Sequence, residues 1–252
     1  MPRGEVAAGL LALVRVSTWQ LARRAGWGRL FAWADRPAQA LIPTQGPSAA
    51  WWQQRRQLIR DFHYLALGDS TAQGIGASAP GRSYVGQLVH RIEARLGAPI
   101  RVTNLAVSGA TSQQCATEQI PRAAGALRTA PQLVTVAIGA NDIANWDPVR
   151  FHRSLSSILA ALPAHTIVAE LPCFHLPWND RKVHEANRIL HRIAGARGLS
   201  VAPLYAATRA RSLPGILTEF AADAFHPNDR GYEVWADAFW PWVSRRLEPL
   251  SD

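Results

Sequence analysis

Ser70 directly follows an apolar segment, in the run Leu65-Ala-Leu-Gly-Asp-Ser70. A serine hydroxyl is a poor nucleophile at neutral pH. It becomes reactive when a histidine accepts its proton and an acid holds that histidine in the right tautomer. The chain contains a single Asp-x-x-His sequence, at Asp223-Ala-Phe-His226. These three residues could attack a carbonyl group if the fold brings Asp223 and His226 to Ser70.

Two further polar segments also come directly after apolar runs. One is Asn104-Leu-Ala-Val-Ser-Gly109 and the other is Ile138-Gly-Ala-Asn141-Asp142. Glycine suits positions at which the backbone must approach a substrate closely, because it has no side chain. Asparagine offers a neutral hydrogen-bond donor.

The elements that must position these residues alternate between short apolar strands and amphipathic helices. The sequence predicts five strands, at Tyr64–Leu67, Ile100–Val107, Leu133–Ile138, Thr166–Leu171 and Leu199–Leu204. It predicts helices through Val85–Leu96, over 112–128, 148–161 and 179–197, and around Tyr232, Trp235, Phe239 and Trp242. Strands that alternate with helices predict an α/β fold with a parallel sheet covered on both sides. Ligands of such sheets bind beyond the carboxyl ends of the strands, where the polar segments lie.

The four polar segments, in this order and at these elements, resemble the SGNH hydrolases, also called the GDSL family of esterases and lipases. The resemblance covers roughly residues 61–245 and implies a three-layer α/β/α sandwich, flavodoxin-like in outline, with a five-stranded parallel sheet. The family name has leucine after the serine, where this chain has Thr71, a position that does not enter the chemistry.

The resemblance also implies a role for each segment. It implies that Ser70 is the nucleophile, His226 the general base and Asp223 the residue that orients it. The backbone N–H groups of Ser70 and Gly109 and the side-chain amide of Asn141 would form the oxyanion hole. Removal of one such donor typically lowers the rate about 10²–10³-fold. Asp223 and His226 lie three residues apart, so their pairing would be formed within one loop.

Each residue taken alone has a simpler interpretation. Ser70 could cap a helix, Gly109 could serve a turn, Asn141 could serve a turn or a cap, and His226 could lie on a surface loop. All four of these simple interpretations require that the segments do not meet in space. The presence of all four segments in one chain favours catalysis instead. We interpret Asp69 and Asp142 as structural acids that bond loop backbone. Asn104 could brace the Ser70 loop or serve a turn.

Other site classes find little support. The run Gly74-Ile-Gly76-Ala-Ser-Ala79 fits a dinucleotide fingerprint, but no acid follows on the second strand. His184-Glu185 lacks a second histidine at the zinc-protease spacing, and neither a phosphate-binding loop nor a Gly-x-Ser-x-Gly elbow is present. Cys115 and Cys173 are interpreted as small core residues. We therefore expect no cofactor and no metal.

Charge and tryptophan content separate the chain into two parts. The net charge is +9, of which residues 1–60 carry +7 and residues 61–252 only +2. Residues 1–60 also contain five of the ten tryptophans. We interpret residues 1–60 as a basic, Trp-rich N-terminal helical arm and linker, and residues 61–252 as the hydrolase domain. Prolines and a glycine predict the linker near residues 37–48.

The arm could lie on a membrane interface, as a basic helix with tryptophans does, or it could pack on the body or on a partner. Its apolar run Val6–Val14 is too short to span a bilayer, and no clean signal cleavage site follows. A cytoplasmic or membrane-surface location is therefore slightly favoured over export. The body has no basic stripe interleaved with aromatic residues, so nucleic-acid binding is not expected.

The sequence thus predicts a serine ester hydrolase that cleaves carboxylic esters of small molecules or lipids through an acyl-enzyme on Ser70. An acyltransferase with the same serine, passing the acyl group to a sugar or lipid alcohol, is the alternative. A non-catalytic binding module is a third interpretation, which the complete set of site residues disfavours. Trp146 and Trp178 could wall the substrate pocket or pack in the core. The sequence does not define the oligomeric state.

Overall fold

The computed structural model describes residues 42–174, 177–211, 215, 218–223 and 225–248. Its centre is a five-stranded, fully parallel sheet in the order β2-β1-β3-β4-β5. The strands are β1 (His63–Gly68), β2 (Arg101–Asn104), β3 (Leu133–Ala137), β4 (Ile167–Ala169) and β5 (Ser200–Ala202). This strand order is that of flavodoxin-like folds, and it confirms the predicted fold class.

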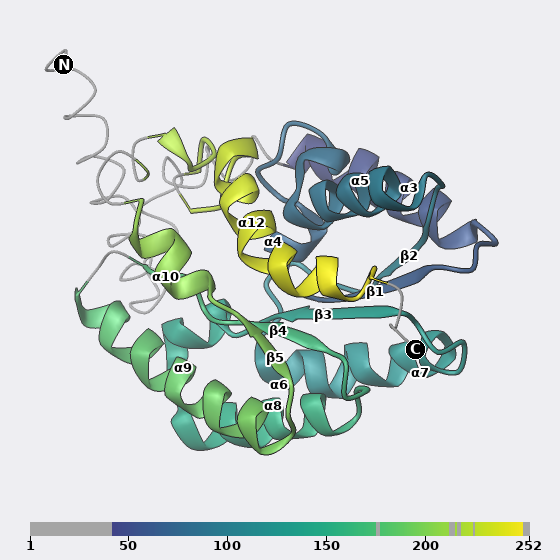
Figure 1. The fold of residues 1–252 in the computed structure, drawn as a ribbon. Coiled ribbons are helices and arrows are strands. Elements are labelled where there is room, and N and C mark those ends of the chain that lie inside the picture. Colours follow the sequence, from purple (N-terminus) through teal and green to yellow (C-terminus); the bar gives the residue numbers. More distant parts are fainter. Residues whose placement is uncertain (1–41, 175–176, 212–214, 216–217, 224, 249–252) are drawn as a thin grey trace, which may run out of the picture.

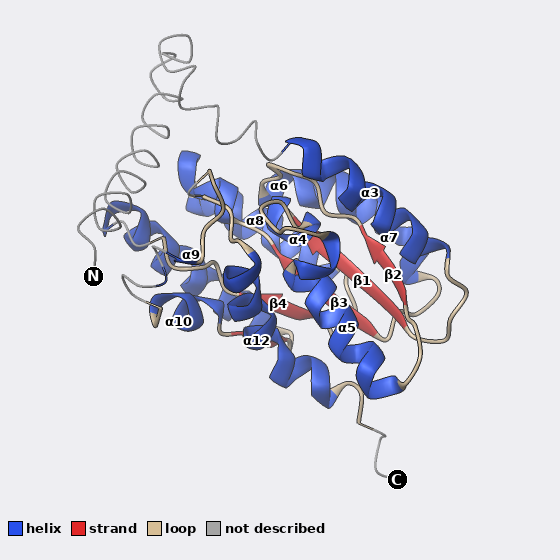
Figure 2. Ribbon diagram, turned by 90° about the horizontal axis from the view of Figure 1, so that it is seen from above, coloured by secondary structure: helices blue, strands red, loops and turns tan. Residues whose placement is uncertain are grey.

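Helices cover both faces of the sheet and make the expected three layers (Figures 1 and 2). One layer contains α3 (Ile42–Gln57), α5 (Tyr84–Leu96) and α12 (Asp229–Arg245). The other contains α6 (Ser112–Gln114), α7 (Ile120–Leu127), α8 (Pro148–Ala160) and α9 (Pro177–Ala196). Shorter helices are α4 (Ser70–Gln73), which follows β1 directly, and α10 (Leu204–Arg209), which follows β5. Short 3₁₀ helices form η1 (Pro80–Arg82) and η3 (Ala140–Asn145). None of the helices that the structure describes has both the length and the apolar character that crossing a lipid bilayer requires.

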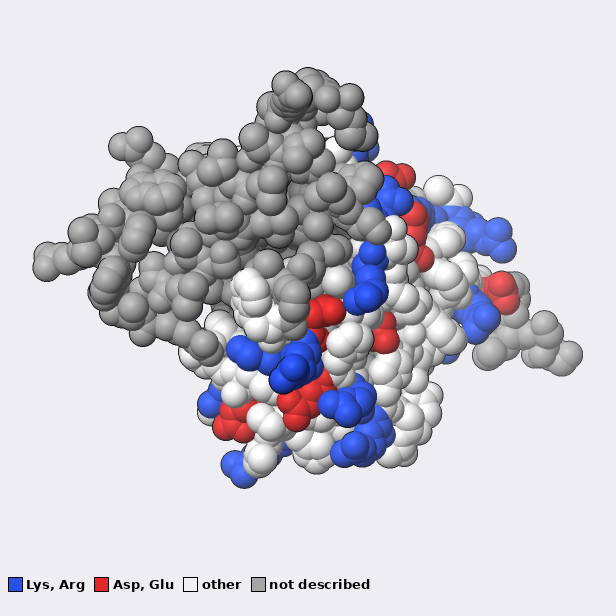
Figure 3. Space-filling model, turned by 90° about the vertical axis from the view of Figure 1, so that its left-hand side faces the viewer, with Lys and Arg blue, Asp and Glu red and all other residues white. Residues whose placement is uncertain are grey.

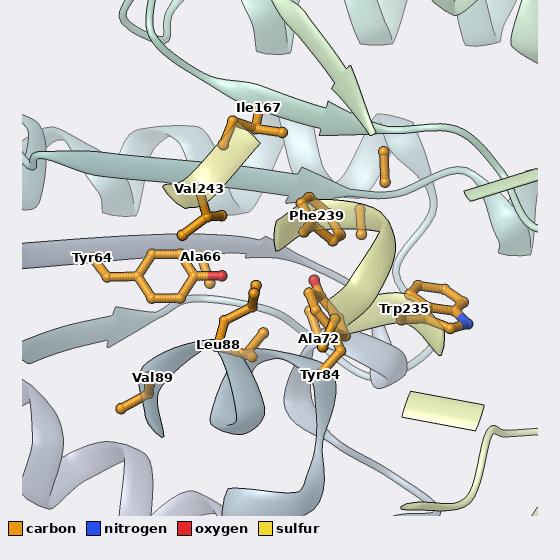
Figure 4. Packing of buried hydrophobic residues seen from close by; sticks show 14 of the residues in the cluster. Tyr64, Ala66, Ala72, Tyr84, Leu88, Val89, Ile167, Trp235, Phe239 and Val243 are labelled. Atoms are coloured by element: carbon orange, nitrogen blue, oxygen red, sulfur yellow. The ribbon is translucent and has the colours of Figure 1, made fainter. Parts of the chain in front are cut away.

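The strand sequences explain why both faces are covered. Successive side chains of a strand point to opposite faces, and every residue of β1 is buried. Tyr64 and Ala66 join one core cluster with residues of α5 and α12, whereas Leu65 and Leu67 join the other with residues of α7, α8 and α9. Each fully buried leucine contributes about 1.5–3 kcal/mol to stability. The first cluster is aromatic, and Tyr84 stacks on Phe239 in it, with ring centroids 5.3 Å apart (Figure 4).

A buried histidine opens β1. His63 is 3% exposed, and its ring nitrogens contact the hydroxyls of Thr129 at 3.0 Å and Thr103 at 2.9 Å. The Thr129 hydroxyl donates to the carbonyl of Ala126, so it can only accept from Nδ1, and Thr103 then donates to Nε2. Burial, with a smaller contribution from the charge of Arg101, lowers the pKa of His63 to about 4. The neutral imidazole therefore has both nitrogens satisfied.

Helix α3 corrects one prediction. The linker expected near residues 37–48 is wrong for residues 42–48, which begin α3. Pro43 lies in the first turn, where a missing N–H removes no bond within the helix. Trp52, further along, is 7% exposed and packs in the first core cluster, which favours a helix despite the glycine and prolines before it. The expected helix face over 6–21 and the rest of the arm to residue 41 lie outside the described residues.

Several other elements differ in detail from the prediction: β4 and β5 are shorter than expected, and Leu204, expected to end the fifth strand, begins α10. The second strand ends at Asn104 and not at Val107, because the Asn104 side chain accepts a hydrogen bond from the N–H of Ala106 and turns the chain. The predicted helix over 112–128 is interrupted by a π-helical turn, η2 (Cys115–Gln119). The described surface carries mixed charge: Figure 3 shows Lys and Arg beside Asp and Glu on one face.

Candidate active site

The structure places Ser70 at the first position of α4, immediately beyond β1. Asp69 caps this helix, and its Oδ1 accepts hydrogen bonds from the backbone N–H and the hydroxyl of Thr71, at 2.9 and 2.7 Å. Gly68 permits the tight passage from strand to helix, since a Cβ there would lie 2.5 Å from the carbonyl oxygen of Ala137. Ser70 is 4% exposed, so its hydroxyl is held in a nearly closed environment.

The loop before α12 brings His226 to Ser70 across 156 residues of sequence. The Nε2 of His226 lies 2.8 Å from the Oγ of Ser70, and its Nδ1 lies 2.5 Å from the Oδ2 of Asp223. The other oxygen of Asp223, Oδ1, accepts from the backbone N–H groups of Phe225 and His226, both at 3.0 Å. The three side chains thus form a continuous hydrogen-bonded chain from carboxylate to hydroxyl.

The loop is packed closely enough to keep this geometry. The N–H of Ala221 donates to the carbonyl of His226 at 2.8 Å. Gly76, with φ +98°, lies against the same loop, and a Cβ there would come within 2.9 Å of the Cβ of His226. Gly76, part of the run that fits a nucleotide fingerprint, therefore has a packing role beside the histidine.

The electrostatics of Asp223 favour an ionised carboxylate. Burial alone would raise its pKa, but hydrogen bonds from His226 and from two backbone N–H groups outweigh burial and hold the pKa below its usual range. A carboxylate can only accept, so the Nδ1 of His226 carries the ring proton and Nε2 presents its lone pair to the Ser70 hydroxyl. This is the tautomer that a general base requires.

Asn141 and Gly109 lie on two loops that are bonded to each other. Asn141 follows β3 on η3, and its Nδ2 donates to the carbonyl of Ala110 at 3.0 Å. The same nitrogen lies 3.4 Å from the Oδ2 of Asp69, the residue next to the serine. Gly109 is exposed with φ +76°, a left-handed conformation that favours glycine, and open space surrounds its Cα. Asn141 therefore links Asp69, which precedes Ser70, to the Gly109 loop.

Buried acids hold these loops, in agreement with their interpretation as structural. Asp142 is 3% exposed and accepts from the backbone N–H of Ser112 at 2.8 Å and from its hydroxyl at 2.7 Å. Burial raises the pKa of Asp142 and also that of Asp69, and hydrogen bonds from Ser112 and Thr71 respectively oppose this shift. Asn104 serves both roles considered for it: its amide donates to the carbonyl of Ala72 in α4 at 2.7 Å, and its oxygen stabilises a turn.

One polar residue near the site was missed by the sequence analysis. Gln119 is fully buried, and its amide bonds the N–H and the carbonyl of Gly68. The signal was a lone glutamine on an apolar face, at helical spacing between Cys115 and Ala123. Of the two tryptophans considered for the pocket, Trp146 packs on Phe151 and Trp178 is 58% exposed. Within the described part of the chain, no three His, Cys, Asp or Glu side chains gather as a metal site would require.

The amino-acid sequence was compared with models of known protein families. The model of the GDSL-like lipase/acylhydrolase family matches residues 66–234, which is more than half of the chain. The chain belongs to this family. The resemblance drawn from the four polar segments is thereby confirmed.

Among curated proteins, the GDSL-like esterase Rv1075c of Mycobacterium tuberculosis is 29% identical over 210 residues. The match covers 76% of this chain and 64% of the relative, so the chain spans less than two thirds of that protein. Among solved structures, the lipase Lip_vut3 from a goat rumen metagenome has a TM-score of 0.61 at 20% identity, covering 74% of this chain and 100% of that one. The acetylxylan esterase Axe2 of Geobacillus stearothermophilus has a TM-score of 0.55 at 20% identity, covering 75% and 97%. At these identities the structures show the fold alone.

Proposed function

We propose that this protein is a serine ester hydrolase that works through an acyl-enzyme on Ser70. The observation that carries the proposal is the hydrogen-bonded chain from Asp223 through His226 to the Ser70 hydroxyl, with distances of 2.5 and 2.8 Å. The ionised carboxylate fixes the imidazole as an acceptor, and this arrangement is what a serine needs to act as a nucleophile.

In the first step, His226 takes the Ser70 proton while Oγ bonds to the ester carbonyl carbon. The carbonyl oxygen becomes an oxyanion, for which the N–H groups of Ser70 and Gly109 and the amide of Asn141 are the proposed donors. The Ser70 N–H suits this role because the first N–H groups of a helix have no partner within it. Of the two Asn141 amide hydrogens, the one that faces Asp69 at 3.4 Å has the weaker bond and is the one we assign to the oxyanion.

Collapse of the tetrahedral intermediate breaks the bond to the leaving alcohol, which receives the proton from His226. Water then attacks the acyl-enzyme, giving its proton to His226, and the second collapse returns that proton to Ser70 and releases the acid. Every proton in the cycle passes through one imidazole. A carboxylic ester and water therefore suffice as reactants.

An acyltransferase is the second candidate, because an alcohol could replace water in the second half of the reaction. The observation that bears on it is the exposed position of Gly109, where, apart from its chain neighbours, none of the described residues comes within 4 Å of an added Cβ. Product analysis with and without added sugar or lipid alcohols separates the two reactions. Transfer products in excess of free acid would favour the transferase.

The test of the proposal is a panel of p-nitrophenyl acyl esters and acetylated sugars, together with a fluorophosphonate probe. We expect hydrolysis of at least one ester, labelling of Ser70, and loss of both in Ser70→Ala without loss of fold. A folded protein that hydrolyses none of the esters and leaves Ser70 unlabelled would refute the proposal. It would also revive the binding-module interpretation.

The named relatives guide the choice of substrates without deciding it. Lipases and an acetylxylan esterase share the fold, so the panel spans acetyl to long acyl chains. Membrane contact through residues 1–60, and a cytoplasmic or membrane-surface location, stay predictions. Fractionation of cells with and without residues 1–41 tests both.

A further inference from the structure

We propose that Gln119 is a positioning residue for catalysis, whose side-chain amide fixes the end of β1 from which the nucleophile departs. This inference rests on the proposed function, since it assigns to Gln119 an effect on the reaction of Ser70. The residue touches neither the serine nor its histidine and acts through the backbone of Gly68.

The need for such a residue follows from the unequal lengths of β1 and β2. The two strands pair from His63 and Arg101 as far as Ala66 and Asn104, after which β2 ends while β1 continues to Gly68. The polar backbone groups of a buried strand must find partners. Beyond the end of β2, the N–H of Val107 still reaches the Gly68 carbonyl at 3.2 Å, whereas the N–H of Gly68 finds its acceptor in the side chain of Gln119.

The side chain of Gln119 bonds β1 at Gly68, where β2 has already ended. Its Oε1 accepts from the N–H of Gly68 at 3.0 Å, and its Nε2 donates to the carbonyl oxygen of Gly68 at 2.7 Å. A primary amide is the side chain that can accept and donate side by side, as the backbone of a neighbouring strand does. Gln119 is fully buried, so water does not compete for either bond.

The positions of the Ser70 nucleophile and of the Gly109 loop both depend on the backbone of Gly68. Gly68 lies two residues before Ser70, and its carbonyl oxygen also accepts from the N–H of Val107 at 3.2 Å. Val107 lies two residues before Gly109, on the loop proposed to line the oxyanion hole. A shift at Gly68 would therefore move the nucleophile and an oxyanion donor relative to each other.

The local helix geometry brings Gln119 to this position. The helix that begins at α6 widens into the π turn Cys115–Gln119, in which the N–H of Ile120 bonds the carbonyl of Cys115. One residue more in a turn rotates the following side chains about the helix axis, and such turns occur frequently at functional sites. Cys115, at the start of the turn, contacts the same Gln119 oxygen at 3.6 Å.

The experiment compares Gln119→Met and Gln119→Glu with Gln132→Met. Gln132 is a matched control, because its Oε1 accepts from the N–H of His63 at 2.7 Å, at the opposite end of the same strand. The assay is p-nitrophenyl acetate hydrolysis, or the best ester of the acyl panel, with folding monitored by circular dichroism at each pH.

We expect Gln119→Met to lower kcat at least about 10-fold with KM changed less than about 2-fold, because misplacement of catalytic groups by about 1 Å can cost 10²-fold. Gln132→Met should retain the parent kcat. Gln119→Glu should work near pH 6, where a protonated carboxyl reproduces both hydrogen bonds. It should lose activity at higher pH as the acid ionises, an alkaline limb that the parent lacks.

Three results would overturn the inference. One is a folded Gln119→Met with the parent kcat. Another is an equal loss of kcat in Gln132→Met, and the last is a pH profile of Gln119→Glu with no alkaline limb. Failure of the proposed function is distinguishable from all three, because it would appear in the parent protein as absent hydrolysis and an unlabelled Ser70. If Gln119→Met does not fold, the pH profile of Gln119→Glu decides alone.

Discussion

We expect replacement of Asp223 by asparagine to abolish the proposed ester hydrolysis, because it moves the ring proton of His226 to the wrong nitrogen. The Oδ1 of Asp223 accepts from the N–H groups of Phe225 and His226, both at 3.0 Å. An asparagine must keep its oxygen towards these two donors, so its NH₂ group faces the Nδ1 of His226. An NH₂ group donates, and Nδ1 must then accept, which moves the ring proton to Nε2. In that tautomer the nitrogen that faces Ser70 cannot take its proton.

The expected loss is about 10³–10⁴ in kcat, the size seen when serine proteases hold their histidine in the wrong tautomer. This corresponds to about 4–5.5 kcal/mol of transition-state stabilisation. Stability should change little by comparison, since both backbone hydrogen bonds to the side-chain oxygen remain. The tautomer and not the fold would thus be the cause of the loss.

The assay is the steady-state rate with the best p-nitrophenyl ester, with thermal melting of each variant alongside. Asp229→Asn is the matched control, because Asp229 lies nearby on α12 and bonds Ser78 without touching His226. A folded Asp223→Asn protein with a kcat within 10-fold of the parent would refute the tautomer argument. So would an equal loss in Asp229→Asn.

Four further variants have outcomes that follow from the structure. Asn141→Ala should lower kcat about 10²–10³-fold with a smaller change in KM, as for other oxyanion donors, and a rise in KM alone in steady-state kinetics would contradict the assignment. His63, with its pKa lowered from 6.5 to about 4, holds fewer protons in the folded state, so it contributes stability above pH 6.5 that is lost as the pH falls towards 4. That loss is about 3 kcal/mol of unfolding free energy. Urea titrations at several pH values should therefore show that the unfolding free energy of His63→Gln falls less between pH 6.5 and 4 than that of the parent. An equal fall in the two proteins would argue against this role of His63. Tyr84→Phe should leave the urea midpoint unchanged or raise it, because the buried Tyr84 hydroxyl has no hydrogen-bond partner among the described residues. Tyr232→Phe should lower the free energy of unfolding by about 1–2 kcal/mol, because the hydroxyl of Tyr232 donates to the carbonyl of Ile75 at 2.5 Å. A larger loss of stability in Tyr84→Phe than in Tyr232→Phe would count against both predictions.

Local signals made much of the fold accessible from sequence. The strand Tyr64–Leu67 is continuously apolar because both of its faces are covered, and this pattern is typical of parallel sheets. The polar segments at Gly68, Gly109 and Asn141 mark chain reversals at strand ends, so the side of the sheet on which they meet follows from topology alone. The sequence therefore predicts that these segments lie at one edge of the sheet.

Features that depend on contacts between distant elements were less accessible. The end of β2 is set by the Asn104 side chain, which turns the backbone after a run that is still apolar. Helix α3 begins in a segment whose prolines and glycine favour a linker, and its packing against the sheet outweighs that preference. The position of the Gln119 side chain depends on a π turn, in which one extra residue enters the helix. The 3.6-residue spacing of apolar residues in the sequence does not show where such a residue is inserted.

Helix α3 packs on the core although it lies outside the segment that the family model matches. The family match begins at residue 66, yet the indole of Trp52 lies in the core and its Nε1 donates to the carbonyl of Gln73, the last residue of the helix that starts at Ser70. Removal of α3 would uncover this core and lose about 4–6 kcal/mol of aromatic burial, since a tryptophan covers about 150–250 Å². Trimming to residue 66 would in addition cut β1. A shortened version for crystallisation or engineering should therefore retain helix α3.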